Sequence, residues 1–399
     1  MTDLKEYTEG KTTFLTADVE EHTAEKGQPT TDMPVFYNPR MRINRDLSVL
    51  LLGAYMKDHD VRLICEPLAG SGVRSLRYLN EVPGVYDALL YDVNPIAIET
   101  ATKNLERYGF QDRAKVLRGD ARLLLMTESR GKRFDFVDVD PFGSPVPFLN
   151  AAIQSLNPRG GLLGLTATDM PALCGVYPRV ALRKYGGLST RAPFVHELAV
   201  RLLLGRTYSI AAMNGCSIRP LAVLSTDHYI RTWIYVKTSK TESNEQADTI
   251  GEIHLCRTCL QTEILPLGHQ RTAEFVHLRD DCPTDIAYAG PLWTGDLFDL
   301  PTLEAAKKFY QKDPTAYAKR VPELLDLMID EHDLVCHPYW DIHEVCDAYN
   351  LTPPKRDEIM KSLIAKGYQV RRTHFKSTAI RTDAPVTEIV SVIEDLTGV

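Results

Sequence analysis

The sequence predicts an α/β protein, in which a doubly wound and mainly parallel sheet is followed by a smaller α+β domain. Two observations indicate this fold class. From residue 61 onward, short apolar runs alternate with amphipathic segments of helical period, which is the order of right-handed β–α–β crossovers. Beyond residue 237 the alternation stops at a polar stretch, and the segments that follow have a different order.

The strands of the first domain are expected where apolar runs end in polar or glycine-rich loops. Parallel strands are expected at 61–65, 87–93, 114–120, 134–140 and 162–169, and an antiparallel pair at 219–225 and 229–237 closes the sheet. A helix is expected at 95–109, with Pro95 in its first turn and Gly109 at its end. The first 30 residues have no clear period, and we expect them to be irregular or loosely docked.

The composition is that of a globular protein with more than one domain. The chain has 399 residues, of which 44% are hydrophobic and 25% charged, so two domains can each bury a core. No apolar run approaches the roughly 18–20 residues of a membrane span. The N-terminus is polar and acidic, unlike a signal or transit peptide, so we expect a cytoplasmic protein without a membrane partner.

A polar, hydrophobe-poor stretch at 238–252 is the best candidate for a domain boundary. It divides the chain into a domain at 1–240, which carries an N-terminal extension, and a second domain at 250–399. The C-terminal part of the second domain reads helix, helix, then strand-like segments with the basic sequence RRTHFK. This order predicts a winged-helix-like module.

Two basic stretches stand out in a chain whose formal net charge is −7. Residues 177–206 contain six Lys/Arg and one Glu, and residues 351–382 contain eight Lys/Arg and two acids. Local excess of positive charge on an acidic protein is what contacts with phosphate groups require. The alternative is that both stretches are solvated helix faces.

A cofactor site is expected at the carboxyl ends of the strands, where doubly wound sheets bind ligands. Gly70 and Gly72 follow the first strand, and Asp92 closes the second strand 20 residues later, where a carboxylate can accept both ribose hydroxyls. The dinucleotide pattern is incomplete, because Ser75 takes the place of its third glycine. With Asp120 at the end of the third strand to accept from an adenine amine, the pattern favours S-adenosylmethionine over NAD. The alternative is that one of the acids caps a helix.

The fourth strand ends in the sequence DVDPFG, which places a carboxylate beside an aromatic ring. Asp140 can accept a hydrogen bond from the exocyclic amine of a base and take its proton as a methyl group arrives. Phe142 can stack on the face of that base. Amino-methyltransferases commonly carry (D/N)PP(Y/F/W) here, and this sequence departs from that pattern at the third position. We interpret the neighbouring Asp138 as a structural acid.

The sequence resembles the tRNA (guanine-26, N2) dimethyltransferases of archaea and eukaryotes over nearly the whole chain from residue 36. The matching stretches are FYNPRMRINRDLSV (36–49), AGSGVRSLR (69–77), DVDPFGSPVPFL (138–149), LGLTATDMPALCGVYPRVALRKYG (163–186), DHYIR (227–231), AGPLWTG (289–295) and RTHFKSTAIRTDAP (372–385). The resemblance implies the class I S-adenosylmethionine-dependent methyltransferase fold. It also implies transfer of one or two methyl groups to the exocyclic amine of guanosine 26 in tRNA.

The resemblance implies roles for eight residues. The S-adenosylmethionine contacts match Arg45, Arg74, Asp92, Asp120 and the backbone of Ala121; the catalytic acid matches Asp140; and the aromatic pair that sandwiches the guanine matches Phe36 and Phe142. Arg45 can pair with the methionine carboxylate. The alternative for Phe36 is a place in the core. We expect the second domain to grip the tRNA body through residues 371–381, and we infer no obligatory protein partner.

Eight cysteines are scattered along the chain and do not form a disulfide framework. Many family members carry two C-x-x-C pairs before the GPLW segment. Here the first pair is Cys256 and Cys259, but the second reads Cys282 and Asp285, so a zinc site would have an uncommon set of three Cys and one Asp. His269 or His277 is the alternative fourth ligand. Cys174 is expected to be a small core residue.

Three rival functions remain open from the sequence. The first is methylation of an amine on another RNA or on DNA. The second is an inactive methyltransferase fold that only binds RNA, which the intact acids Asp92, Asp120 and Asp140 disfavour. The third is an NAD oxidoreductase, which the incomplete glycine loop disfavours.

Overall fold

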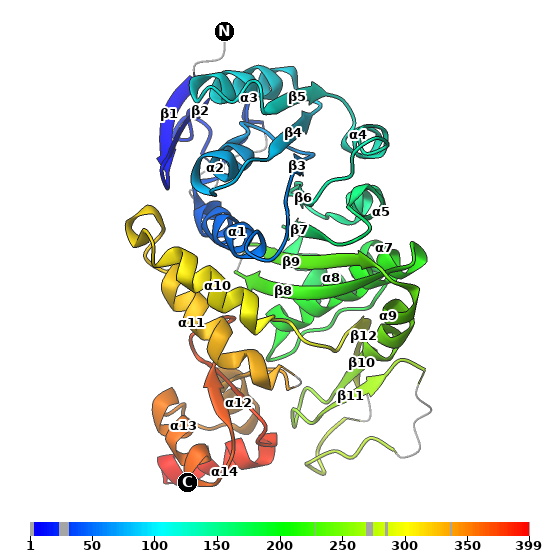
Figure 1. The fold of residues 1–399 in the computed structure, drawn as a ribbon. Helices are drawn as coiled ribbons and strands as arrows, with labels where there is room; N and C mark the ends of the chain where they lie inside the picture. The colour runs from blue at the N-terminus through cyan, green and yellow to red at the C-terminus, as the bar shows by residue number, and fades with distance from the viewer. Residues whose placement is uncertain are drawn as a thin grey trace. The chain divides into compact units, whose positions relative to one another are not determined.

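The computed structural model of the protein describes residues 4–23, 32–226, 228–268, 274–283, 286–335 and 337–398. The chain forms two compact units, and each is discontinuous in sequence (Figure 1). Unit 1 comprises 1–167, 231–238 and 300–325, and unit 2 comprises 168–230, 239–299 and 326–399. The continuous domains expected at 1–240 and 250–399 divide the chain differently, and they stay a prediction.

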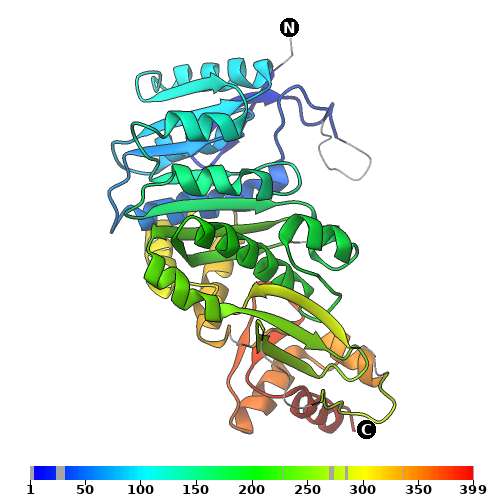
Figure 2. The ribbon, with the colours of Figure 1, turned by 90° about the vertical axis from the view of Figure 1, so that its right-hand side faces the viewer.

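The predicted α/β fold is confirmed, and its central sheet has seven strands in the order β5-β4-β3-β6-β7-β9-β8. The strands are β3 (Leu63–Glu66), β4 (Asp87–Asp92), β5 (Ala114–Arg118), β6 (Phe136–Val139), β7 (Gly161–Ala167), β8 (Cys216–Ser225) and β9 (Ile230–Thr238). Strands β3 to β7 pair in parallel, and they run side by side in Figure 2. The order reverses between β3 and β6, so the crevice where such sheets bind ligands lies at the carboxyl ends of these two strands.

Helices cover both faces of the sheet in unit 1. They are α1 (Arg42–Tyr55), α2 (Val73–Glu81), α3 (Pro95–Arg107), α4 (Ala121–Glu128), α5 (Val146–Ser155) and α10 (Leu300–Tyr310). Figure 1 shows α1 and α2 on one face, and α4 and α5 on the other. Helix α3 confirms the expected helix at 95–109: Asn94 caps it by accepting a hydrogen bond from the Ile96 amide, and Gly109 follows it with a φ of 69°.

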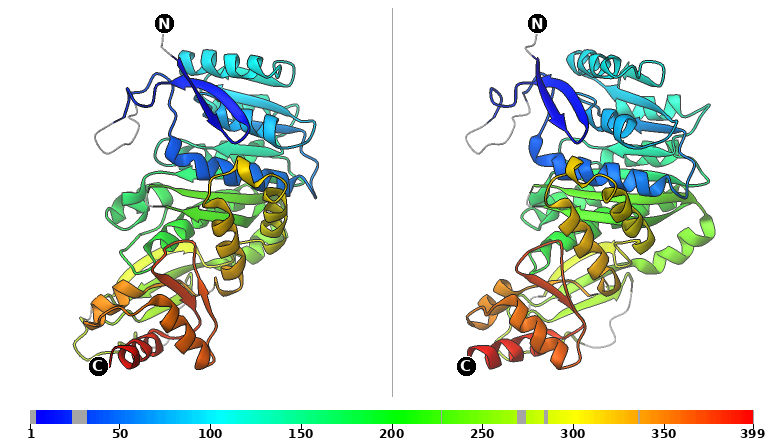
Figure 3. Two further views of the ribbon diagram at one scale, coloured as in Figure 1. Left: turned by 90° about the vertical axis from the view of Figure 1, so that its left-hand side faces the viewer. Right: turned by 60° about the vertical axis from the view of Figure 1, so that its left-hand side comes forward.

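The expectation of an irregular N-terminus is wrong, because β1 (Leu4–Glu9) and β2 (Thr12–Ala17) form an antiparallel hairpin (Figure 3). The Phe14 side chain is fully buried. The Asn104 side chain on α3 holds the hairpin, since it accepts from the Leu15 amide at 2.7 Å and donates to the Leu15 carbonyl at 2.9 Å. The hairpin is ordered by residues distant in sequence, which the local pattern does not reveal.

Unit 2 begins with helices and continues with a small antiparallel sheet in the order β11-β10-β12. Besides β8, its elements up to that sheet are α6 (Met170–Leu173), α7 (Pro178–Tyr185), α8 (Val195–Met213), α9 (Lys240–Glu245), β10 (Ile250–Leu255), β11 (Thr262–Pro266) and β12 (Ala287–Trp293). The polar stretch at 238–252 is therefore not a bare linker. It holds α9, which Ser239 caps by accepting a hydrogen bond from the Glu242 amide.

The C-terminal part of unit 2 has the expected order of two helices followed by strands. Helix α11 (Val321–Glu331) begins in unit 1 and ends in unit 2, and the elements after it are β13 (Trp340–Asp341), α12 (Ile342–Tyr349), α13 (Arg356–Ala365), β14 (Val370–Arg372), β15 (Ala379–Thr382) and α14 (Val386–Thr397). The three strands form an antiparallel sheet in the order β13-β15-β14 around a buried apolar cluster. The finer assignment as a winged-helix-like module stays a prediction. Among the described residues, no helix has both the length and the apolar character needed to span a membrane.

Candidate active site

The glycine loop after β3 is fixed to the end of β4 in unit 1. The Gly70 amide donates to Oδ2 of Asp92 at 2.8 Å, and the Asn94 amide donates to Oδ1 at 2.9 Å. Gly72 has a φ of 73°, and a Cβ there would lie 3.1 Å from the Ala101 Cβ, so this position requires glycine. Each carboxylate oxygen of Asp92 still has a lone pair for a ribose hydroxyl.

Asp120 caps helix α4, which is the alternative that the sequence left open for one of the acids. Its carboxylate accepts from the Arg122 amide at 2.8 Å and pairs with the Arg122 side chain at 2.7 Å. The hydrogen bonds from Arg122 lower the Asp120 pKa to about 2. Ala121 is buried as the first residue of α4. Contact of either residue with an adenine stays a prediction.

Arg45 lies buried on α1 and already has a carboxylate partner. Its Nε donates to Oε2 of Glu9 at 2.7 Å, and its Nη2 also contacts Glu9 and donates to the Asn38 carbonyl at 2.9 Å. Burial alone raises the pKa of Glu9, but the charge and hydrogen bonds of Arg45 and the charge of Arg77 lower it to about 2. Sequence reasoning missed Glu9, because it belongs to the hairpin that was expected to be loose.

Arg74 lies between the two acids of the DVD sequence. Its Nη2 donates to Asp140, and its Nε lies 3.6 Å from the Oδ2 of Asp138. Its Nη1 donates to the side chain of Asn44 at 2.9 Å and to Ser48 at 3.3 Å. Both partners are on α1, so the arginine links two helices to the end of β6.

Asp138 is fully enclosed, which agrees with its interpretation as a structural acid. Its Oδ1 accepts from Nη1 of Arg231 at 2.6 Å, and its Oδ2 accepts from the Tyr78 hydroxyl. Burial acts to raise the Asp138 pKa, but Arg231 and Arg74 outweigh it, so the net shift is downward. Arg231 was not singled out by itself, although it belongs to the quoted DHYIR stretch.

Asp140 is the open end of this group, since its side chain is 20% exposed whereas that of Asp138 is 1% exposed. Beside it, Phe142 is 58% exposed, and its ring centroid lies 4.5 Å from that of Phe36 at an interplanar angle of 77°. Phe36 is only partly buried, which disfavours a place in the core. Its carbonyl would lie 3.2 Å from a Cβ at Gly70, so the aromatic pair and the glycine loop adjoin. A base fits between the rings only if they separate.

One further buried acid stands at the end of β3. Glu66 is 3% exposed, and one of its carboxylate oxygens accepts from the Ser75 amide at 2.9 Å. Burial raises its pKa to about 8, so it is largely protonated at neutral pH. In this form it adds no negative charge beneath the glycine loop.

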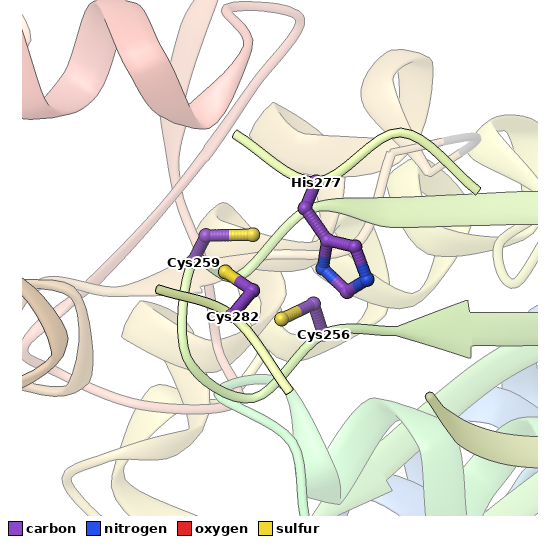
Figure 4. A group of neighbouring side chains, drawn as sticks. All are labelled: Cys256, Cys259, His277 and Cys282. Atoms are coloured by element: carbon purple, nitrogen blue, oxygen red, sulfur yellow. The ribbon is translucent and has the colours of Figure 1, made fainter. Parts of the chain in front are cut away.

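Unit 2 contains a separate cluster of three thiols and one imidazole (Figure 4). The ligand atoms of Cys256, Cys259, His277 and Cys282 all lie within 4.8 Å of one another. Three sulfurs and one imidazole nitrogen form a common ligand set for structural zinc. Asp285, the expected fourth ligand, lies outside the described residues, and His277 is the alternative that the sequence left open. Cys174 is partly buried, and burial raises its pKa to about 11, which fits an inert thiol.

Comparison with known proteins gives one consistent result. Residues 10–394 match the family described as N2,N2-dimethylguanosine tRNA methyltransferase. Proteins named tRNA (guanine(26)-N(2))-dimethyltransferase are 34% identical in Methanosphaera stadtmanae, over 91% of this chain and 91% of theirs, and 35% identical in Methanothermobacter thermautotrophicus, over 91% and 93%. The structure of Trm1 from Pyrococcus horikoshii with S-adenosyl-L-methionine has a TM-score of 0.80 at 29% identity, over 98% of this chain and all of that one. The chain therefore belongs to the N2,N2-dimethylguanosine tRNA methyltransferase family.

Proposed function

We propose that the protein methylates the exocyclic amine of guanosine 26 in tRNA, first to the monomethyl and then to the dimethyl product. The observation that carries this proposal is the arrangement in unit 1, where Asp140 and the Phe36–Phe142 pair adjoin the glycine loop. The names of the relatives and the cofactor in the Pyrococcus horikoshii structure support the same reaction. The substrate partner is tRNA, and the expected location is the cytoplasm.

The cofactor in this proposal is S-adenosyl-L-methionine, which supplies an electrophilic methyl group on a sulfonium. The loop from Gly70 to Gly72 lets the backbone approach the cofactor, and Asp92 accepts the ribose hydroxyls. Arg45 and Arg74 are the proposed partners of the methionine carboxylate, and each would share its guanidinium with the acid that it already binds, Glu9 for Arg45 and Asp140 for Arg74. Protonated Glu66 avoids repulsion of that carboxylate.

Asp140 acts as the acceptor of the proton in each transfer. The N2 lone pair of guanine is delocalised into the ring, so the amine is a weak nucleophile until a carboxylate accepts a hydrogen bond from it. As the N–C bond forms and the S–C bond breaks, the nitrogen becomes cationic and gives a proton to Asp140. Arg74 binds Oδ2 of Asp140, which leaves Oδ1 for the amine.

The aromatic pair holds the base while the transfer occurs. Guanosine 26 must leave the tRNA stack to reach Asp140, and stacking on Phe142 and Phe36 offsets part of the unstacking cost. The two rings contact each other, so a base that enters between them takes the place of that contact.

The decisive experiment is a nucleoside assay on two tRNA transcripts. The protein and labelled S-adenosyl-L-methionine are incubated with a transcript carrying G26 and with one carrying A26 at that position. We expect mass spectrometry to detect N2-methyl and N2,N2-dimethylguanosine only from the first transcript. Methylation of both transcripts would indicate a different base, and methylation of neither would end the proposal.

We also propose that the cluster in unit 2 holds one structural zinc ion through Cys256, Cys259, Cys282 and His277. The donor set fits zinc, and bound zinc would tie the loops of this region together. Metal analysis of the purified protein should find about one zinc per chain. His277→Ala should lose it, whereas Asp285→Ala and the control Cys174→Ala should keep it. Loss of zinc in Asp285→Ala would instead indicate that Asp285 is the fourth ligand.

A further inference from the structure

The two basic stretches of the sequence differ in how many of their basic side chains form ion pairs within unit 2. In the C-terminal stretch, Arg371 lies 3.2 Å from Asp333, and Lys376 pairs with Asp341. Arg381 is fully buried and bonded to two glutamates. Much of the charge on 371–381 is therefore neutralised within the protein.

The stretch around α7 keeps its charge on the surface. Residues 170–196 contain four Lys/Arg and no acid. Lys184 pairs with Asp169 at 2.8 Å, but Arg179, Arg183 and Arg191 are exposed and have no ion-pair partner within the described part of the chain. Arg179 and Arg183 are four residues apart on α7 and so share a face of this helix.

Close backbone packing holds Arg191 beside the turn between α6 and α7. Gly175 in this turn has a φ of 78°, and a Cβ there would overlap the Thr190 carbonyl carbon and lie 2.7 Å from the Arg191 nitrogen. The Ser189 hydroxyl donates to the Leu173 carbonyl. The position of Arg191 is therefore set by the protein before any partner binds.

The Cys/His cluster adds a fourth arginine to this surface. Arg257 lies in the loop between Cys256 and Cys259, two of the residues labelled in Figure 4, and its Nη2 donates to the Thr190 hydroxyl at 2.5 Å. The Arg257 side chain is otherwise exposed. Because Thr190 precedes Arg191, this contact places the Arg257 side chain near Arg191.

Apolar side chains are interleaved with these charges. Tyr177 is 58% exposed and Leu182 is 48% exposed, although both are large and hydrophobic. Arginines combined with an exposed aromatic ring suit a nucleic acid, because phosphates accept from guanidinium groups and a base can stack on tyrosine. A second copy of the chain is disfavoured as the occupant, because it would bring the same unpaired arginines together.

We propose that Tyr177, Arg179, Leu182, Arg183, Arg191 and Arg257 form the surface of unit 2 that docks tRNA, hereafter the α7 face. This inference rests on the proposed function and replaces 371–381 as the main phosphate-binding segment. The Cys/His cluster contributes only indirectly to tRNA binding, because it holds the loop that carries Arg257.

The test compares two triple variants that each remove three positive charges. One is Arg179→Ala/Arg183→Ala/Arg191→Ala on the α7 face, and the matched control is Arg371→Ala/Arg372→Ala/Lys376→Ala. Filter binding of the tRNA transcript is measured across salt concentrations, with S-adenosyl-L-methionine affinity as a check on folding. A third variant, Arg179→Lys/Arg183→Lys/Arg191→Lys, keeps the charge.

We expect the α7 variant to bind tRNA roughly tenfold to hundredfold more weakly, with a salt slope smaller by about 0.7–0.9 per lost contact. The lysine variant should retain most of the slope, and the control should change both quantities less. Equal tRNA affinity and slope in the α7 variant and the wild type would overturn the inference. So would a wild-type dimer that this variant converts to monomer, since the occupant would then be a second copy. Wild-type protein that neither binds nor methylates tRNA would instead overturn the proposed function.

Discussion

Each unit contains a buried network of charged side chains, and the two networks differ at their ends. In unit 1, Arg231, Asp138 and Arg74 lead to Asp140, whose side chain is 20% exposed. In unit 2, the members are all at most 3% exposed: Arg201, Glu197, Arg381, Glu331 and His374. One network ends at the surface, and the other is closed.

The difference indicates two roles: the network in unit 1 positions one side chain, and the network in unit 2 stabilises the fold. A closed network satisfies its own charges, so its removal leaves buried groups unpaired and weakens the fold. An open network uses the same kind of contacts to hold one exposed group in a defined orientation. Arg74 does this for Asp140. Asp138 contacts Arg74 on its buried side, and Arg231 pairs with Asp138. The following predictions test this distinction.

The largest effect is expected at the open end. Asp140→Asn keeps the shape of the side chain but is a far poorer proton acceptor, so the methyl-transfer rate should fall by about 10²–10⁴-fold. The affinity for S-adenosyl-L-methionine, measured by calorimetry, should stay close to that of the wild type. A variant that binds cofactor and turns over normally would end the role of Asp140.

Arg381→Met should act on the closed network and hence on stability. It leaves Glu197 and Glu331 buried without the guanidinium that each now contacts, so the free energy of unfolding should fall by about 3–5 kcal/mol. The control Arg371→Met removes an arginine with only surface pairs and should change it by about 1 kcal/mol or less. Urea denaturation measures both. Equal effects of the two changes would contradict the distinction between the networks.

Glu9→Gln should change how stability depends on pH. The pKa of Glu9 is about 2 in the folded protein against 4.5 ordinarily, so its ionised form stabilises the fold above pH 4.5 and this contribution is lost as the pH falls toward 2. The lost contribution is about 3 kcal/mol. The free energy of unfolding, measured by denaturation at several pH values in this window, should depend less on pH in Glu9→Gln than in the wild type. The exposed Glu6→Gln on the same strand serves as control, and a flattening of equal size there would argue against Glu9.

The last prediction distinguishes the two strand-end acids. Asp92→Ala should weaken S-adenosyl-L-methionine binding by about 1.5–3 kcal/mol per lost hydrogen bond. Asp120→Ala should cost about 0.5–2 kcal/mol of stability, because it removes the cap of α4. Calorimetry and thermal unfolding on both variants measure these quantities. Unchanged cofactor affinity in Asp92→Ala would reduce this residue to a support for the glycine loop.

Much of unit 1 was predictable because its signals are local. Apolar runs of strand length alternate with helical periods, and Asn94-Pro95 marks the start of α3. Chain order in a doubly wound sheet brings the ends of β3, β4 and β6 to the same edge. For this reason the sequence alone predicts that Asp92 and Asp140 lie at the same edge of the sheet. It also predicts Phe142 there, because this residue is only two positions after Asp140.

The N-terminal hairpin and the fourth member of the Cys/His cluster were harder to predict for the same physical reason. Their local sequences are short and show no distinctive spacing, and long-range contacts order them. Asn104 binds the hairpin from a position 89 residues away. His277 joins the thiols through packing that no spacing rule specifies.

The sequence by itself determined the fold class, the strand-end acids and the family, since these follow from residue order and local periodicity. The tertiary structure decided which charged side chains form ion pairs inside the protein and which stay exposed on its surface. Arg381 and Glu197 are 184 residues apart in sequence yet form one buried pair, whereas Arg179 and Arg183 keep their charge exposed. A charged side chain has its effect through its neighbours and its distance from water, and only folding brings distant residues into that range.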